Sequence, residues 1–150
     1  MIAVVQRVNN ASVDVEDVGV VGEIGIGLCV LLGVVVGDTE KEADWIAGKI
    51  ARLRIFEDAS GRFNLGIKDV GGRVLLISQF TLAGDCTRGN RPSFIRAADP
   101  DGAKALYERV ARTLVEVHEL RVETGRFQKT MQVRLENQGP ATIILDTAST

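Results

Sequence analysis

The sequence predicts one compact α/β domain of the α+β kind, spanning residues 1–150, in which two amphipathic helices pack outside a mixed sheet. A chain of 150 residues is the size of one domain and can bury a substantial core. Only two segments repeat apolar residues at helical intervals, whereas many short apolar runs between turn residues have the character of strands. The order of these elements does not by itself determine the topology of the sheet.

The first strands are expected over residues 2–8, 12–15 and 18–24, with an acidic turn before the third, so that the chain starts as a β-meander. A glycine-rich break precedes the continuous apolar run 28–36. Such a run is typical of a strand that is buried on both faces of a sheet. We therefore expect this strand to lie in the interior.

The first helix is expected over residues 40–54. Thr39 and Glu42 have the spacing of a capping box, and apolar residues then recur at helical intervals. A turn at 58–62 and a short strand at 63–67 are expected to follow.

The second half of the chain is expected to contain a core strand at 73–79, a long helix and the closing strands. Asp99 and Pro100 combine an N-cap acceptor with proline at the first helical position, and the helix is expected to end near residue 117. Its predicted apolar stripe comprises Ala103, Leu106, Tyr107, Val110, Leu114 and Val117. Closing strands are expected over residues 121–124, 130–136 and 141–145, the last two joined by a turn at 137–140.

The charge of the chain excludes a protein that coats nucleic acid through its overall field. The formal net charge is −2, and the composition is 45% hydrophobic and 25% charged, as in an ordinary globular domain. Any contact with RNA must therefore be local. Residues 87–96 carry Arg88, Arg91 and Arg96 without an acidic residue, which is the pattern either of such a contact or of a solvated loop.

The sequence shows no pattern typical of a membrane helix, a signal peptide or a metal site. No apolar run approaches the roughly 18 residues of a membrane helix, and no basic region precedes an apolar stretch at the start, so we expect a cytoplasmic protein. Cys29, Cys86 and the single His118 cannot supply a four-ligand zinc site or a disulfide framework. We expect no metal and no organic cofactor.

Two segments stand out as a candidate site. Ser78, Gln79, Phe80 and Thr81 follow the apolar core of a predicted strand, where polar side chains open onto solvent. Gly139-Pro140 would, taken alone, be a turn between two strands, because glycine tolerates positive φ and proline fixes φ.

Together with several stretches along the chain, these segments resemble the D-aminoacyl-tRNA deacylases. The resemblance covers nearly the whole chain. It implies one β-barrel-like domain with the helices packed outside, which forms a homodimer with active sites at the subunit interface. It also implies hydrolysis of the ester that joins a D-amino acid to the terminal adenosine of tRNA, without a cofactor. The further family-like stretches are residues 1–8, 22–25, 31–34, 54–56, 91–94, 123–127 and 143–145.

The resemblance also implies roles for individual residues. Gly139 and Pro140, joined by a cis bond and reaching into the neighbouring subunit, would exclude L-amino acids, so that achiral glycyl-tRNA is a further candidate substrate. Arg7 would orient this pair; without the resemblance, it would be a surface arginine on a strand. Weaker expectations for contacts with the pocket or with tRNA concern Asn137, Met131, Arg88, Arg91 and Arg96, and Met131 would serve equally as a core residue.

The sequence lacks an obvious general base for ester hydrolysis. His118 is expected at the surface at a helix end, and no G-x-S-x-G motif is present. The family resemblance favours assistance by the ribose hydroxyl beside the ester, with Ser78 and Gln79 positioning the adenosine. Backbone N–H groups of Phe80 and Thr81 would stabilise the oxyanion. The alternatives are Thr81 as nucleophile and Phe80 as a core residue.

Two competing functions remain at this point. A noncatalytic module could bind the end of tRNA through the three arginines, and a small-ester or thioester hydrolase could use Cys86 near Arg88. The sequence also departs from the family pattern at four positions. These are Phe63 where methionine is common, Cys86 where threonine is usual, Gln138 where aspartate is common and Ala141 where valine is common.

Overall fold

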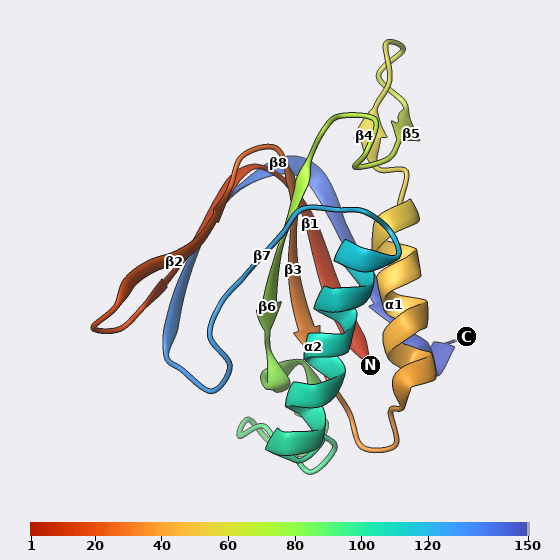
Figure 1. Cartoon of the computed structure of the whole chain (residues 1–150). Helices are drawn as coiled ribbons and strands as arrows, with labels where there is room; N and C mark the ends of the chain where they lie inside the picture. Colours follow the sequence, from red (N-terminus) through yellow and green to blue (C-terminus); the bar gives the residue numbers. More distant parts are fainter. Residues whose placement is uncertain (150) are drawn as a thin grey trace.

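A strongly curved sheet with two helices on one face forms the body of the molecule (Figure 1). The computed structural model describes residues 1–149. The strands are β1 (Ile2–Val15), β2 (Gly19–Ile24), β3 (Gly27–Gly33), β4 (Phe56–Glu57), β5 (Phe63–Leu65), β6 (Arg73–Ser78), β7 (Val122–Thr124) and β8 (Met131–Asp146). The helices are α1 (Glu40–Arg52) and α2 (Pro100–Glu116), with short 3₁₀ turns η1 (Phe80–Ala83) and η2 (Thr147–Ser149).

The main sheet is mixed and has the strand order β2-β1-β3-β6-β7, with β8 on the other side of β1. β1 pairs antiparallel with β2, β3 and β8, whereas β3–β6 and β6–β7 are parallel. The sheet curls far enough for β2 to meet β7, since a Cβ on Gly22 would lie 2.9 Å from the Thr124 carbonyl oxygen. The predicted α+β domain with a barrel-like sheet and external helices is confirmed.

The helices begin where the sequence predicted. Thr39 and Glu42 form the reciprocal capping box of α1, and the Asp99 carboxylate accepts a hydrogen bond from the Gly102 N–H at the start of α2. Tyr107 links α2 to β6 by a hydrogen bond, in which its buried hydroxyl donates to the Leu76 carbonyl oxygen at 2.8 Å. Burial raises the pKa of Tyr107, so this group stays a donor.

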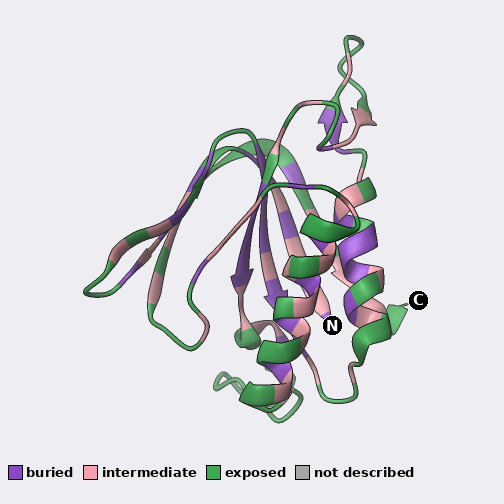
Figure 2. Ribbon diagram, in the orientation of Figure 1, coloured by how far each residue is buried: buried purple, intermediate pink, exposed green. Residues whose placement is uncertain are grey.

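Two apolar clusters fill the interior. The larger lies between the helices and the sheet, and the smaller lies inside the curl of the strands (Figure 2). β3 faces both clusters, as its continuous apolar run predicted. The smaller cluster comprises Val8, Ala11, Val13, Ile24, Cys29, Leu75 and Ile77, and burial raises the pKa of the Cys29 thiol to about 11.

Several local predictions were wrong. The start of the chain is not a meander, because β1 lies between β2 and β3 as one long strand. β3 ends at Gly33 rather than residue 36, and the two-residue strand β4 was not foreseen. Val117 is 68% exposed, because α2 ends at Glu116 and the stripe ends with it.

The largest error concerns the predicted turn at residues 137–140. No reversal occurs there, because β8 continues from Met131 to Asp146 alongside β1. Gln6 pairs with Thr142 and Val8 pairs with Asn137, so residues 138–141 stand opposite Arg7 alone. The Gly-Pro pair therefore lies in a bulge, within a long strand, in which four residues stand opposite one. We refer to residues 138–141 as the β8 bulge.

Candidate active site

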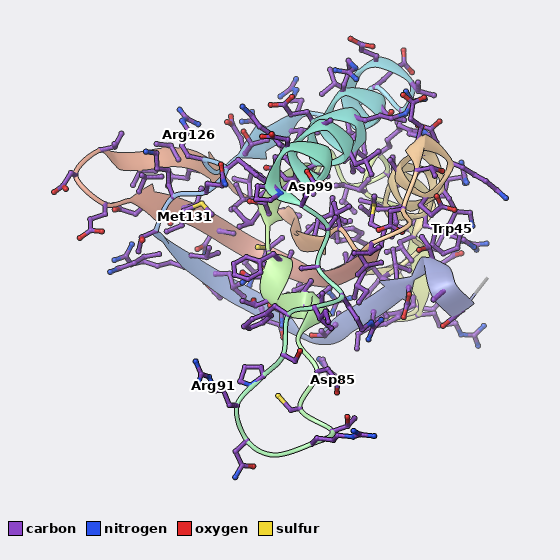
Figure 3. All side chains as sticks on the ribbon, turned by 90° about the horizontal axis from the view of Figure 1, so that it is seen from below. Trp45, Asp85, Arg91, Asp99, Arg126 and Met131 are labelled. Carbon is purple, nitrogen blue, oxygen red and sulfur yellow. The ribbon has the colours of Figure 1, made fainter. Side chains whose placement is uncertain are left out.

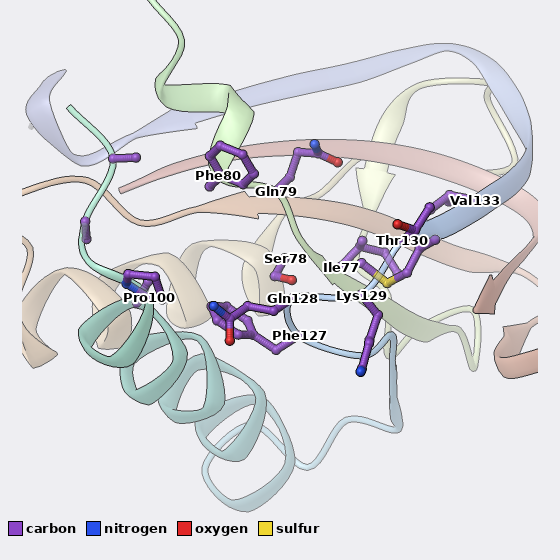
Figure 4. Close-up of a pocket in the computed structure, with 14 residues that line it drawn as sticks. Ile77, Ser78, Gln79, Phe80, Pro100, Phe127, Gln128, Lys129, Thr130 and Val133 are labelled. Carbon is purple, nitrogen blue, oxygen red and sulfur yellow. The ribbon is translucent and has the colours of Figure 1, made fainter. Parts of the chain in front are cut away.

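A cleft of about 570 Å³ opens at the carboxyl end of β6 (Figure 4). The end of β6, the start of α2 and the loop before β8 form its walls, and Ser78 lies between Phe80 and the 127–128 segment. The lining is mainly apolar, and Lys129 is its one ionisable side chain among the described residues. The lining residues are Ile77, Ser78, Gln79, Phe80, Ala97, Ala98, Pro100, Ala103, Phe127, Gln128, Lys129, Thr130, Met131 and Val133.

The chain leaves the sheet directly after Ser78 and turns into η1. The Gln79 N–H still donates to the Leu32 carbonyl oxygen at 2.7 Å, and Leu82 N–H donates back to Gln79. Between these bonds, the N–H groups of Phe80 and Thr81 donate to no acceptor within residues 1–149. Two adjacent backbone donors are thus available to a ligand at the rim of the cleft.

The side chains of this segment are accessible. Phe80 is 59% exposed and packs edge-on against Phe94, with ring centroids 5.3 Å apart, so the alternative that it is a core residue is wrong. The Gln79 amide donates to the Thr81 hydroxyl. The hydrogen-bond partner of the Thr81 hydroxyl is thus an amide, and no base is bonded to this hydroxyl within residues 1–149.

The β8 bulge is organised from the opposite strand. Arg7 is 2% exposed, and its Nε donates to the Gln138 carbonyl oxygen at 3.0 Å. The Asn137 amide closes the base of the bulge by donating to the carbonyl oxygens of Arg7 at 3.1 Å and Ala141 at 3.3 Å. The Gly139–Pro140 peptide bond is cis, and both residues are exposed. Arg7 is therefore not a surface residue.

Within one chain, the cleft and the β8 bulge lie level with opposite ends of β3. Ser78 pairs with Leu32, which pairs with Ala3, whereas the bulge follows Asn137, which pairs with Val8. Five residues along β1 and three strand spacings across the sheet separate them by about 20 Å. Consistent with this, Figure 1 shows the middle of β8 bending over the end of the sheet nearer β4 and β5, whereas the chain leaves β6 at the opposite end.

Two further residues that were predicted for the site lie in different parts of it, one in the cleft and one in the β8 bulge. Met131 lines the cleft and packs tightly, because a Cβ on Gly125 would lie 2.6 Å from its sulfur. Asn137 lies outside the cleft, in the base of the bulge.

Arg88, Arg91 and Arg96 belong to an exposed loop that projects from the body, as the position of Arg91 beside Asp85 in Figure 3 illustrates. Asp85 and Ser93 close the base of this loop by exchanging backbone hydrogen bonds of 2.8 and 2.9 Å. The Thr87 N–H holds the pKa of the Asp85 carboxyl below its usual range.

Sequence reasoning missed the wall formed by residues 127–130. Gln128 has φ 59°, a left-handed conformation that turns the loop toward the cleft, and nothing in the local sequence marks it. Phe127 belongs to the family-like stretch 123–127, which did not predict a cleft residue. Its ring packs on that of Tyr107, with centroids 6.0 Å apart. An aromatic residue shortly before a strand was the one available signal.

His118, Cys86 and metal ligands do not contribute to this arrangement. His118 follows the far end of α2, about 25 Å from the helix start that lines the cleft, and partial burial with nearby Arg52 and Lys68 lowers its pKa. Cys86 is exposed on the loop that carries Arg88, Arg91 and Arg96, which we call the arginine loop. In residues 1–149 no cluster of three metal-ligating side chains occurs, and no helix there has the length and apolar composition to cross a membrane.

A mainly apolar cleft with free backbone donors and two polar side chains at its rim can bind a ligand that has an apolar ring and a polarised carbonyl group. The fold and the cleft thus define an α+β domain with a candidate ligand-binding site. The family described as D-Tyr-tRNA(Tyr) deacylase matches residues 4–146. The chain belongs to this family, as the sequence predicted, and is accordingly a hydrolase.

Similar proteins carry the name D-aminoacyl-tRNA deacylase, and two solved structures share the fold. A D-aminoacyl-tRNA deacylase of Thermotoga petrophila is 55% identical and covers 99% of this chain and 98% of its own length. One of Anaeromyxobacter dehalogenans is 56% identical and covers 97% of both. A solved structure described as c-Myc DNA Unwinding Element Binding Protein has a TM-score of 0.90 and 40% identity over 98% of this chain and 99% of its own. A probable eukaryotic D-amino acid tRNA deacylase shares the fold, with a TM-score of 0.83 at 17% identity over 96% and 97% of the two chains.

Proposed function

We propose that this chain hydrolyses the ester of D-aminoacyl-tRNA to free D-amino acid and tRNA, as a homodimer acting in the cytoplasm in translation quality control. The observation that carries the proposal is the match to the deacylase family over residues 4–146, with a cleft and free donors at the segment that the resemblance singled out. The names of the relatives state the same substrate for those proteins.

The cleft suits the terminal adenosine of a charged tRNA. An adenine ring fits an apolar cleft with exposed aromatic rings, and Ser78 and Gln79 supply hydrogen bonds to its polar atoms. The ester carbonyl then lies at the rim, against the N–H groups of Phe80 and Thr81. These donors stabilise the oxyanion that forms when water attacks the carbonyl carbon.

The reaction needs a proton acceptor and a donor to the leaving ribose oxygen. The lining residues that the structure describes include no carboxylate and no histidine. The ribose hydroxyl adjacent to the ester is the nearest polar group of the substrate itself, and it relays the proton from the attacking water to the departing oxygen. This substrate assistance leaves to the protein the tasks of positioning and oxyanion stabilisation.

Selection against L-amino acids falls to Gly139 and Pro140. A bulge with its backbone held by Arg7 and Asn137 is a rigid obstacle, against which an L side chain clashes while a D side chain points away. Such a filter recognises the configuration at Cα rather than the side chain. Glycyl-tRNA, which presents no side chain, passes it and is a second substrate.

The distance of about 20 Å between cleft and bulge supports a dimer in which each bulge serves the partner's cleft. The required two-fold axis passes midway between them, near Val4 on β1. On that face, Val4 pairs with Ile144 and Gln6 with Thr142, and Ile144 is 69% exposed. An exposed apolar residue at this point suits burial against a second copy.

A noncatalytic nucleic-acid-binding module is the second candidate. The exposed arginine loop favours it, and one structural relative with 40% identity carries the name of a DNA-element-binding protein. In the catalytic proposal the same three arginines hold the phosphates of the tRNA end. The two candidates differ in whether ester is lost.

The direct test measures ester loss from matched D- and L-tyrosyl-tRNA, with and without a chelator. The proposal predicts hydrolysis of the D ester alone, at a rate that the chelator does not change. Glycyl-tRNA in the same assay should also be cleaved. Tight binding of tRNA without loss of either ester would replace the proposal with the binding module, and sensitivity to thiol alkylation without a need for RNA would point to Cys86.

A further inference from the structure

Arg7 carries a charge that is buried to 98% with little to balance it. Its Nη1 donates to the Ile55 carbonyl oxygen at 2.8 Å and its Nε to that of Gln138 at 3.0 Å. Among residues 1–149, the one carboxylate within 4 Å of this guanidinium belongs to Glu57, at 3.7 Å from Nη2, and its side chain is 54% exposed. A long ion pair to an exposed carboxylate is weak, so other groups must hold the guanidinium in place.

The face of an aromatic ring covers this guanidinium. The ring centroid of Phe63 lies 5.1 Å from the Arg7 Cζ, which is the geometry of a cation–π contact. The two carbonyl oxygens locate the edge of the planar guanidinium, and the ring restricts the tilt of its plane. Together, these contacts determine where the Arg7 Nε–H points and hence where the β8 bulge is held.

Phe63 itself stands on a braced hairpin. The Asp58 carboxylate accepts hydrogen bonds from Ser60 N–H at 2.8 Å, Arg62 N–H at 3.1 Å and the Asn64 amide at 3.2 Å. These bonds hold the pKa of Asp58 below its usual range, and the bond from the Arg62 N–H has the largest effect. The carboxylate therefore remains charged and keeps its hydrogen bonds. The hairpin is thereby ordered without deep burial, and Phe63 remains 48% exposed.

We infer that Phe63 is a positioning residue for stereochemical selection, which acts through Arg7 on Gly139 and Pro140. The inference rests on the proposed function of the bulge. Phe63 touches no part of the cleft. Its loss therefore affects the exclusion of L esters and leaves the hydrolysis of D esters nearly unchanged.

The kinetic test compares three variants by kcat/KM for matched D- and L-tyrosyl-tRNA. Phe63→Leu keeps an apolar side chain but removes the ring, and we expect the D-over-L ratio to fall about two- to fivefold. Phe63→Tyr keeps the ring and should restore the ratio. Arg62→Ala, which changes the neighbouring exposed side chain and keeps the backbone N–H that binds Asp58, is the control and should leave the ratio unchanged. An unchanged ratio in Phe63→Leu would overturn the inference, as would equal losses in all three variants.

A second measurement keeps the inference independent of activity. In an NMR spectrum of ¹⁵N-labelled protein, the Arg7 Nε–H should exchange slowly and carry a ring-current shift that Phe63→Leu abolishes and Phe63→Tyr retains. Lack of any hydrolysis by the wild-type chain would refute the proposed function alone. An Arg7 Nε–H signal that is the same in wild type and Phe63→Leu would refute the contact, whatever the activity.

Discussion

The two halves of the candidate site are built in opposite ways. The cleft segment, residues 78–81, is where a regular strand ends, and its donors are free because the chain leaves the sheet there. The β8 bulge is an irregularity inside the longest strand, held by a hydrogen bond between residues 131 positions apart in the sequence. The difference teaches that the half to which we assign the reaction depends on local chain geometry, whereas the half to which we assign selectivity depends on long-range contacts. Substitutions should therefore separate rate from selectivity.

The largest effect is expected from Gly33→Ala, which moves the cleft segment without removing a polar group. A Cβ at this position would lie 2.8 Å from the Gln79 carbonyl oxygen and 3.1 Å from the Leu82 Cβ, so the backbone that carries the free N–H groups must shift. We expect kcat/KM for D-tyrosyl-tRNA to fall by about 100-fold, with the D-over-L ratio little altered. Single-turnover hydrolysis measures this, and a loss below threefold in a folded variant would refute the role of the backbone donors.

The reciprocal change in the bulge is Gly139→Ala. A Cβ there would lie 2.8 Å from the Asn137 Oδ1, so the amide that closes the base of the bulge is displaced. We expect the D-over-L ratio to fall about tenfold, mainly because L esters are admitted, since only the exclusion of a clash is lost. Parallel assays on the two esters check this; a fall in D-ester hydrolysis with selectivity intact would contradict the division of roles.

Ile144→Arg tests whether the two halves meet across subunits. A charge on the exposed face of β8 opposes burial against a second copy, and we expect the dimer dissociation constant to rise about tenfold or more. Val18→Arg is the matched control, because Val18 is 70% exposed and lies on the β1–β2 turn, away from this face. Analytical ultracentrifugation distinguishes them; equal dimerisation of the two variants would place the interface elsewhere.

Removal of the Thr81 hydroxyl should have a small effect. The hydroxyl accepts a hydrogen bond from Gln79 and has no base beside it, whereas the Thr81 N–H is a property of the backbone. Thr81→Ala should therefore lower kcat by less than about threefold. Complete inactivity of a folded Thr81→Ala protein that still binds tRNA would make this residue the nucleophile.

The smallest effect is expected at a contact remote from both halves. Arg109 donates to both oxygens of Asp44, which joins α2 to α1 and lowers the pKa of Asp44. A depressed folded pKa gives stability that is present above about pH 4 and is lost as the pH falls through the folded value. Because the pair is exposed and screened by solvent, its contribution to stability is small. Urea unfolding of Asp44→Asn should differ slightly from wild type at pH 7 and converge with it once the pH lies below the folded pKa of Asp44, with activity at pH 7 unchanged.

Much of the fold follows from local patterns. The capping box at Thr39, the Asp99-Pro100 start of α2 and the apolar run of β3 each predicted an element that the structure contains. These signals succeed because the groups that determine the structure are neighbours in the sequence.

The remaining features depend on distant partners. Gly139-Pro140 has the composition of a turn, yet pairing with β1 on both sides keeps the chain extended through it. Likewise, burial of Arg7 requires Ile55 and Phe63, and the wall at Gln128 requires a left-handed residue that is not glycine. The cleft segment could be located from a strand pattern, but no spacing in the sequence reports these contacts.

The central claim, that each cleft works with the bulge of the other subunit, is tested most directly with a heterodimer purified through two different tags. One subunit carries Gly33→Ala and the other carries Gly139→Ala, so that across the interface one site combines an intact cleft with an intact bulge. The account predicts about half the wild-type rate on D-tyrosyl-tRNA with wild-type rejection of the L ester. Continued hydrolysis of the L ester, as in the Gly139→Ala homodimer, would show that cleft and bulge of the same subunit act together and would contradict the account.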